Sequence, residues 1–160
     1  MRESMARLTP RFCADRTVRE YTEQHYLPAA AAYRERAADK GAIGRQMVDW
    51  RHGLEEKWAT VHFGEVKVET LGEQHIFGVQ VCLNDLDPNA VRVELYADGA
   101  NGGAAVRQEM KRAGQLGGGS YIYHAAVSAS RSPADYTARI IPCFSGVAVP
   151  LEAPQILWQR

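Results

Sequence analysis

The chain has 160 residues, the length of one domain or of one domain with an appendage. Its 19 Lys and Arg residues balance 19 Asp and Glu residues, which argues against a general nucleic-acid binder and against a protein held electrostatically on a membrane. The sequence also lacks an apolar run of about 18 residues for a membrane-spanning helix and the apolar core of a secretory signal behind Met1.

The first part of the chain has a helical pattern. Asp15 is a candidate N-cap, because its carboxylate can accept hydrogen bonds from the free amides of a first turn. Val18, Tyr21 and His25 then recur on one helical face. These residues predict a helix over about 15–27.

A second helical stretch follows Pro28, which ends the first helix or begins the next one at its first position. The alanine-rich residues after it have high helix propensity, and Gly41 is a natural left-handed stop. An apolar stripe at spacings of three and four then comprises Ile43, Met47, Trp50, Leu54 and Trp58. We expect this stripe to lie on one side of a helix and to dock on the domain that follows it.

From about residue 60 the apolar residues alternate with a period of two. The strongest runs are 77–83, 91–95 and 121–127, and weaker ones are 61–70, 104–112, 135–144 and 147–149. Turn clusters separate them without intervening helices, a pattern typical of an antiparallel sandwich. We predict a mainly β fold, with two or three α-helices in 1–59 and a β-sandwich in 60–160. An immunoglobulin-like topology is the first expectation, and an open barrel is the alternative.

Two segments resemble ligand loops at first sight. Residues 117–120, three glycines and a serine, would need a helix directly after them to form a phosphate loop. A strand pattern starts at Tyr121 instead, so we predict a hairpin turn. The acidic segment from Asp85 has Ala90 and Tyr96 where a calcium loop needs Gly and Glu, and we predict a polar turn there.

The histidines and cysteines do not form a recognisable reactive motif. No pair of the five histidines has the helical spacing of a metal site, although His62 and His75 could meet across strands. The three cysteines, Cys13, Cys82 and Cys143, are odd in number and far apart. This favours buried thiols in a reducing compartment over a disulfide framework or a zinc site. We therefore expect a cytoplasmic protein and assign no catalytic or metal-binding residue.

Four aromatic residues in the second half are candidates for a sugar-stacking platform on the sandwich. They are Tyr96, Tyr121, Tyr123 and Trp158. The alternative interpretation is core packing, with the phenol oxygens reaching the rim of the domain.

The N-terminal residues resemble the late part of an α-glucan (glycogen or maltodextrin) phosphorylase. The stretches ESMARLTPRF at 3–12 and DRTVREY at 15–21 carry the likeness. In that family a Phe, two small residues, an Asp or Asn and an Arg lead into a helix that ends in Tyr. The matching residues here are Phe12, Ala14, Asp15, Arg16, Val18 and Tyr21. Cys13 stands where the family usually has Ser or Thr.

Later segments look like recurring pieces of the short bacterial and archaeal branch of that family. They are 75–77, 86–88, 93–99, 135–140 and 146–153. With them, the resemblance covers nearly the whole chain. It implies a parent enzyme that uses orthophosphate to cleave the terminal α-1,4-linkage of a glucan and releases glucose 1-phosphate.

The resemblance also limits what this chain can carry. The family holds pyridoxal phosphate on a Lys in a Gly-Thr-Gly-Asn-Met-Lys motif, which is absent here. We therefore expect a non-catalytic C-terminal portion without a cofactor of its own, and Met1 need not be a true start. The implied partners are the upstream catalytic domains, contacted through Phe12, Val18, Tyr21 and Leu27. The alternatives are a carbohydrate-binding module that tethers the enzyme to α-glucan and a domain for homo-oligomer assembly.

Overall fold

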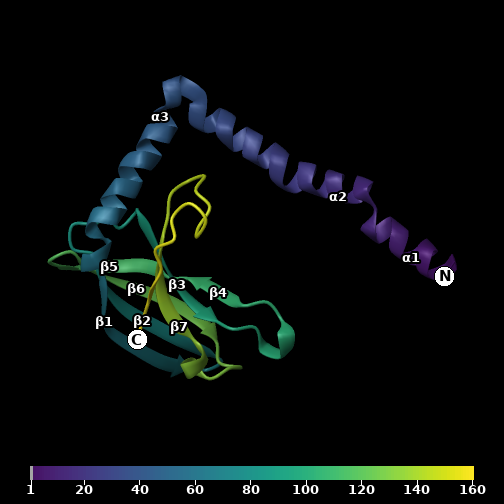
Figure 1. Ribbon diagram of the computed structural model, residues 1–160. Coiled ribbons are helices and arrows are strands. Elements are labelled where there is room, and N and C mark those ends of the chain that lie inside the picture. The colour runs from purple at the N-terminus through teal and green to yellow at the C-terminus, as the bar shows by residue number, and fades with distance from the viewer. Residues whose placement is uncertain (1) are drawn as a thin grey trace. The chain divides into compact units, whose positions relative to one another are not determined.

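Figure 1 shows a computed structural model that describes residues 2–160, apart from the side chains of Arg2, Ser4, Pro10 and Asn101. The chain divides into two compact units between Met47 and Val48, and each is described by itself. Within the described residues, no helix is both long and apolar enough to cross a membrane.

The first unit is helical, with α1 at Arg2–Phe12, α2 at Ala14–Tyr21 and a π-helical turn at Thr22–Tyr26. The predicted cap at Asp15 is wrong, because the extended residue at the N-cap is Cys13. Asp15 is the second residue of α2, where its negative charge still interacts favourably with the free N–H groups at the N-terminus of the helix. The helix α1 was not predicted, since its residues show no apolar period.

The long helix α3 at Leu27–Lys57 contains a break. Three successive residues there have positive φ: Asp39 at 50°, Lys40 at 59° and Gly41 at 77°. The predicted left-handed stop at Gly41 is therefore confirmed. After the break the helix resumes and ends at Lys57, followed by a 3-10 turn at Trp58–Thr60.

The second unit is a sandwich of two four-stranded antiparallel sheets, as predicted. One sheet has the order β1-β2-β6-β5, formed by His62–Leu71, Gln74–Cys82, Ser120–Ser128 and Lys111–Gly117. The other has the order β4-β3-β7-β8, formed by Val106–Glu109, Val91–Ala97, Thr137–Pro142 and Leu157–Trp158. Short 3-10 turns at Ala100–Gly102 and Pro133–Asp135 complete the loops.

The core lies between the two sheets. Alternate residues of β2 and β3, such as Val79 and Val93, are fully buried, and so is Ile140 of β7. Leu54 of α3 is also fully buried in this cluster, against which Trp50 and Trp58 pack. The predicted docking of the stripe on the sandwich is confirmed for these three residues.

The predicted strand at 104–112 is two strands in different sheets. Met110 separates them: its side chain is buried, and its N–H donates to the Val93 carbonyl at 2.9 Å. β4 therefore pairs with β3, while β5 crosses to the opposite sheet and pairs with β6. An alternation pattern carries no sign of such a crossing.

The predicted short strand at 147–149 is wrong. Glu152 closes this segment into a local loop, because its carboxylate accepts from the Ala148 N–H at 2.9 Å and its own N–H donates to the Ala148 carbonyl. The last strand is instead β8, which pairs with Arg139 and Ile140 of β7.

The glycine-rich stretch forms the predicted hairpin turn between β5 and β6. Gly117, Gly118 and Gly119 all have positive φ. The Gly119 carbonyl accepts from the N–H groups of Leu83 and Asn84, which follow β2. A Cβ at Gly119 would collide with the Asn84 backbone, so this position needs glycine.

Candidate functional site

The four aromatic candidates lie in two separate places. Tyr96 on β3 and Trp158 on β8 contact each other edge to face, with ring centroids 5.3 Å apart. Tyr121 and Tyr123 lie on β6 in the other sheet, and Tyr123 is only 5% exposed. The four rings therefore do not form one platform.

A charged cluster surrounds the Tyr96–Trp158 pair. The Arg139 guanidinium lies 4.7 Å from the Tyr96 ring centroid and 5.0 Å from that of Trp158. Its Nε donates to Oε1 of the buried Glu94 at 2.6 Å, and the Nε of Arg92 lies 3.5 Å from the other carboxylate oxygen. Two cations thus share one carboxylate on the outer face of this sheet, and the contacts tie β3, β7 and β8 together.

Trp158 also borders a groove between β1 and β8. This groove has a volume of about 520 Å³ and is lined by His62, Phe63, Leu157, Trp158 and Arg160, with Ile156. Trp158 is 38% exposed. An aromatic ring beside cationic and polar side chains is a suitable surface for a sugar ring.

A second groove opens at the β5 edge of the sandwich, and we call it the β5 groove. One part, of about 350 Å³, includes Arg92, Glu109, Lys111, Arg112 and Tyr123. An adjoining hollow of about 430 Å³ includes Gln115 and Tyr121 and shares Pro88, Asn89 and Arg112 with the first part. The crossing of the chain at Met110 positions this groove, because it places β5 across the sandwich from the start of β3.

The Tyr123 phenol is the unusual group in the β5 groove. Its oxygen is buried and has no hydrogen-bond partner among the described residues. Burial raises the pKa of this phenol, and the Arg112 guanidinium acts in the opposite direction. At neutral pH the phenol is therefore protonated and offers an unused donor. Sequence reasoning named Tyr123 as a stacking residue and missed Arg112, because the register of the β5–β6 hairpin, which makes the two residues partners, is shifted by irregularities that strand alternation does not show.

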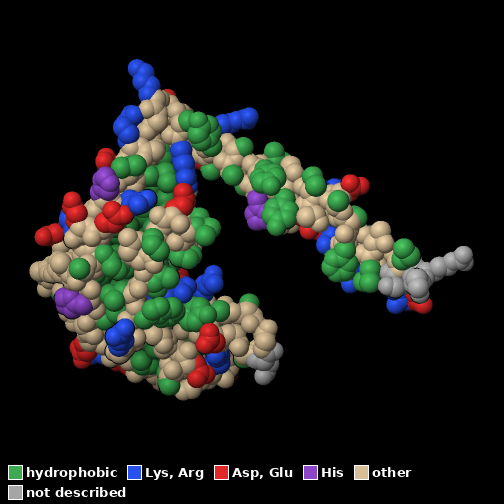
Figure 2. Space-filling view, viewed as in Figure 1, with side chains coloured by type: hydrophobic (Ala, Val, Ile, Leu, Met, Phe, Trp, Pro, Cys, Tyr) green, Lys and Arg blue, Asp and Glu red, His purple; other side chains and the backbone are tan. Residues whose placement is uncertain are grey.

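The predicted interface residues lie on the first unit and are all solvent-exposed. The exposed fractions are 73% for Phe12, 64% for Val18, 52% for Tyr21 and 60% for Leu27. Figure 2 shows hydrophobic side chains along the helices of this unit. Exposure of this many large apolar groups is typical of an interaction surface.

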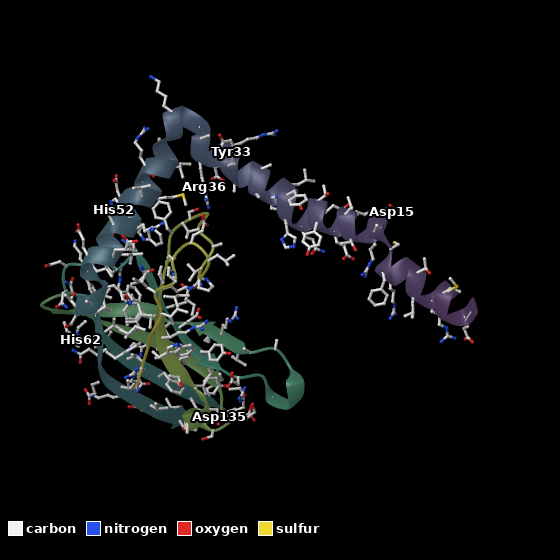
Figure 3. The ribbon with its side chains drawn as sticks, viewed as in Figure 1. Asp15, Tyr33, Arg36, His52, His62 and Asp135 are labelled. Carbon is white, nitrogen blue, oxygen red and sulfur yellow. The ribbon has the colours of Figure 1, made fainter. Side chains whose placement is uncertain are left out.

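The histidines do not converge on a metal site. His62 pairs with Cys82 and His75 with Thr70, at opposite ends of the β1–β2 hairpin. His75 is buried but satisfied, with its ring nitrogens 2.8 Å from Thr70 Oγ1 and 2.9 Å from the Arg131 carbonyl oxygen. In Figure 3, His52, His62 and Asp135 lie on separate elements. Among the residues described, no three His, Cys, Asp or Glu side chains group as metal ligands.

The lysines do not fit a pyridoxal phosphate site. A lysine that forms a Schiff base is activated in a desolvated pocket or beside another cation. Lys40, Lys67 and Lys111 are exposed instead. Lys57 is half-buried, and its ammonium group donates to the Asp85 backbone carbonyl at 3.1 Å.

Comparison with known proteins gives a consistent result. The chain is 29% identical over 153 residues to the glycogen phosphorylases of Mycobacterium tuberculosis (strain H37Rv) and Mycobacterium bovis, which covers 89% of this chain and 18% of each relative. It is also 29% identical over 129 residues to the maltodextrin phosphorylase of Thermococcus litoralis, which covers 77% of this chain and 15% of that relative. The chain thus spans less than a fifth of the length of these curated relatives.

The family described as "Glycogen phosphorylase C-terminal domain" matches residues 58–160. This range includes every strand of the sandwich. The resemblance to phosphorylases that the N-terminal residues suggested is confirmed, and the chain belongs to the glycogen phosphorylase C-terminal domain family.

Proposed function

We propose that this chain is the non-catalytic C-terminal portion of an α-glucan phosphorylase and that it completes or stabilises the enzyme. The parent enzyme would convert α-1,4-glucan and orthophosphate to glucose 1-phosphate, with pyridoxal phosphate held by the upstream catalytic domains. One observation carries the proposal: the apolar residues Phe12, Val18, Tyr21 and Leu27 are exposed on helices in the part that resembles the end of the catalytic region.

The physical argument rests on the stability of these helices. α1 has 11 residues, and isolated helices this short are marginal in water. The helix that begins at Ala14 continues through the π-helical turn into α3, but no residue up to Met47 whose burial is described is buried, so tertiary packing adds little to its stability. Burial of one large apolar side chain contributes about 1.5–3 kcal/mol. Docking of the four exposed residues on the catalytic domains would stabilise both the helices and the domains, while α3 and the sandwich core anchor the C-terminal side.

A chimera tests this role. In the M. tuberculosis glycogen phosphorylase, the matched region would be deleted or replaced by this chain. We expect the deletion to lower glucose 1-phosphate release and the temperature of half-inactivation, and the chimera to restore both. Equal activity and heat resistance of the deleted enzyme would contradict the proposal.

Matched variants of the chimera locate the interface. Replacement of Phe12 and Val18 by Ser should lower the temperature of half-inactivation, because the helices lose their apolar contacts. Leu151→Ser is the control, since Leu151 is 89% exposed but lies on the sandwich unit. If both changes had the same effect, the interface assignment would be wrong.

A second candidate function is glucan binding, which the groove beside Trp158 favours. Arg139 lies over the Trp158 ring, and Phe63 and Arg160 line the same groove. Titration of the chain with maltooligosaccharide should change its tryptophan fluorescence. Trp158→Ala should abolish the change and Val106→Ala, on β4 outside the groove, should retain it. An unchanged response in Trp158→Ala would exclude this groove.

We also propose an immunoglobulin-like topology. Lettered in chain order with β4 as C′, the two strand orders read ABED and C′CFG, which supports this assignment because ABED and CFG are the sheets of the constant-type immunoglobulin fold. Further support would come from a close match to solved domains of that type.

We propose a domain division at 59/60 and a cytoplasmic location. The start of the family match at residue 58 supports the division, although the compact unit already begins at Val48. The thiols of Cys82 and Cys143, which form no disulfide, support the location.

A further inference from the structure

We propose that the β5 groove binds a small phosphate-type oxyanion, either inorganic phosphate or the phosphate group of a sugar phosphate. The Arg112 guanidinium and the Tyr123 hydroxyl would supply the contacts. This inference does not depend on the proposed function, because it rests on unused donors and on charge in the sandwich itself.

The charge of the groove is positive in a chain whose formal net charge is zero. Arg92, Lys111 and Arg112 line its main part, against the single carboxylate of Glu109. Glu94 compensates Arg92 only partly, because it also binds Arg139. No ion pair is found for Arg112 among the described residues, so its guanidinium remains available for an anion. Lys111 is the register partner of His124 on the opposite face of the hairpin, so it adds only to the net charge.

The buried phenol adds a directed donor to this charge. The Tyr123 oxygen lies at the groove without a partner, and an unsatisfied buried polar group is costly unless a ligand or water completes it. Arg112 is the register partner of Tyr123 across β5 and β6, so the guanidinium and the hydroxyl lie on the same face. The exposed Arg112 side chain lies over the Tyr121 ring. A change of its rotamer would give a ligand access to the phenol.

This donor set fits a phosphate oxyanion better than a neutral sugar or a cation. Guanidinium and phenol groups are both hydrogen-bond donors at neutral pH, and charge-assisted bonds from Arg to phosphate are among the strongest in proteins. A metal cation would need several acidic ligands, but Glu109 is the single carboxylate among the described residues of the lining, beside three basic residues. The amides of Asn89 and Gln115 line the outer part, where they can meet hydroxyl groups of a sugar.

The test is a phosphate titration of the whole ¹⁵N-labelled chain followed by NMR, with chloride used to keep the ionic strength constant. We expect saturable amide shifts confined to residues 89–92, 109–115 and 121–123. Arg112→Gln should weaken binding at least tenfold, since it removes a charge-assisted bond. Tyr123→Phe should weaken it several-fold and leave the fold intact, because the hydroxyl it removes has no partner in the free protein.

Arg107→Gln is the matched control, because Arg107 is exposed on β4 but does not line the groove. It should leave the phosphate affinity unchanged. Shifts that do not saturate, or equal weakening by Arg107→Gln and Arg112→Gln, would overturn the proposal in favour of non-specific ion attraction. If Arg112→Gln did not fold, Tyr123→Phe compared with Arg107→Gln would give the same decision.

Two further titrations identify the source of the oxyanion. Tighter binding of glucose 1-phosphate than of inorganic phosphate would assign the groove to a sugar phosphate, and equal binding would assign it to the phosphate group alone. Glucose is the neutral control. Shifts of the same residues with glucose and none with phosphate would overturn the proposal. Loss of phosphate binding in this chain would leave the chimera result for the proposed function unaffected.

Discussion

At the scale of single residues, the arrangement around Glu94 combines burial with charge. Glu94 is only 4% exposed, although its side chain lies on the outer face of its sheet. The Arg139 side chain covers it. The guanidinium in turn lies against Tyr96 and Trp158. A carboxylate buried in this way depends on its cationic partners, because an unpaired buried charge is strongly unfavourable.

Glu94→Gln should therefore destabilise the protein. The change leaves Arg139 without its counter-charge, and removal of one partner from a buried pair typically costs about 3–5 kcal/mol. Urea denaturation would measure the loss. Glu55→Gln is the control: Glu55 forms an exposed pair with Arg51 at 2.9 Å on α3, and solvent screens such pairs, so we expect no measurable change. A loss no larger than that of the control would contradict the assignment.

Tyr123 gives a prediction about pH. Burial raises the pKa of this phenol above the usual value of 10.0. Above that pH the unfolded chain ionises first and binds fewer protons than the folded chain, so stability falls as the pH rises toward the folded-state pKa. Tyr123→Phe should flatten this alkaline loss, with little change at neutral pH. Urea denaturation at several pH values would check it, and parallel curves for both proteins would refute the burial argument.

At the scale of elements, the last turns of α3 contribute to the stability of the sandwich. Leu54 has no exposed surface, and the Trp50 indole N–H donates to the Ala90 carbonyl at 3.3 Å. The Trp50 ring also contacts Phe144, with centroids 5.3 Å apart. The helix thus closes one end of the sandwich core, with contacts to the loop before β3 and to the loop after β7.

Leu54→Ala should lower the stability of the sandwich by about 2–5 kcal/mol, because it leaves a cavity where a fully buried side chain was. Val48→Ala, on the same helix but 52% exposed, should have a much smaller effect. Thermal unfolding followed at near-ultraviolet wavelengths would report both. Equal effects of the two changes would mean that the helix does not contribute to the core.

Strands with strict alternation could be predicted from the sequence, because their period follows directly from burial of one face. β2, β3 and β6 are of this kind, and so is the stripe of α3. The elements that escaped prediction depend on non-local contacts. β8 has two residues and exists because Arg139 and Ile140 offer it a free edge. The β5 groove depends on the crossing at Met110, which places the β5–β6 hairpin, with Arg112 and Tyr123, beside Arg92 of β3.

At the scale of the whole chain, the two units differ in burial. No residue up to Met47 whose burial is described is buried, whereas the sandwich unit holds the entire hydrophobic core. Helices without a core of their own gain little from tertiary packing, which supplies most helical stability in proteins. The first unit should therefore open far more readily than the second.

Hydrogen exchange on the isolated chain tests this difference. At low protein concentration, where light scattering shows a monomer, we expect weak protection of amides 16–26 and strong protection of 91–97 in β3, because β3 is an inner strand that pairs with both β4 and β7. Protection of 16–26 that rises with protein concentration would show that a second copy of the chain covers Phe12, Val18, Tyr21 and Leu27. Strong protection of 16–26 in the monomer would contradict the view that these helices need a partner, since a partner that is absent cannot slow exchange.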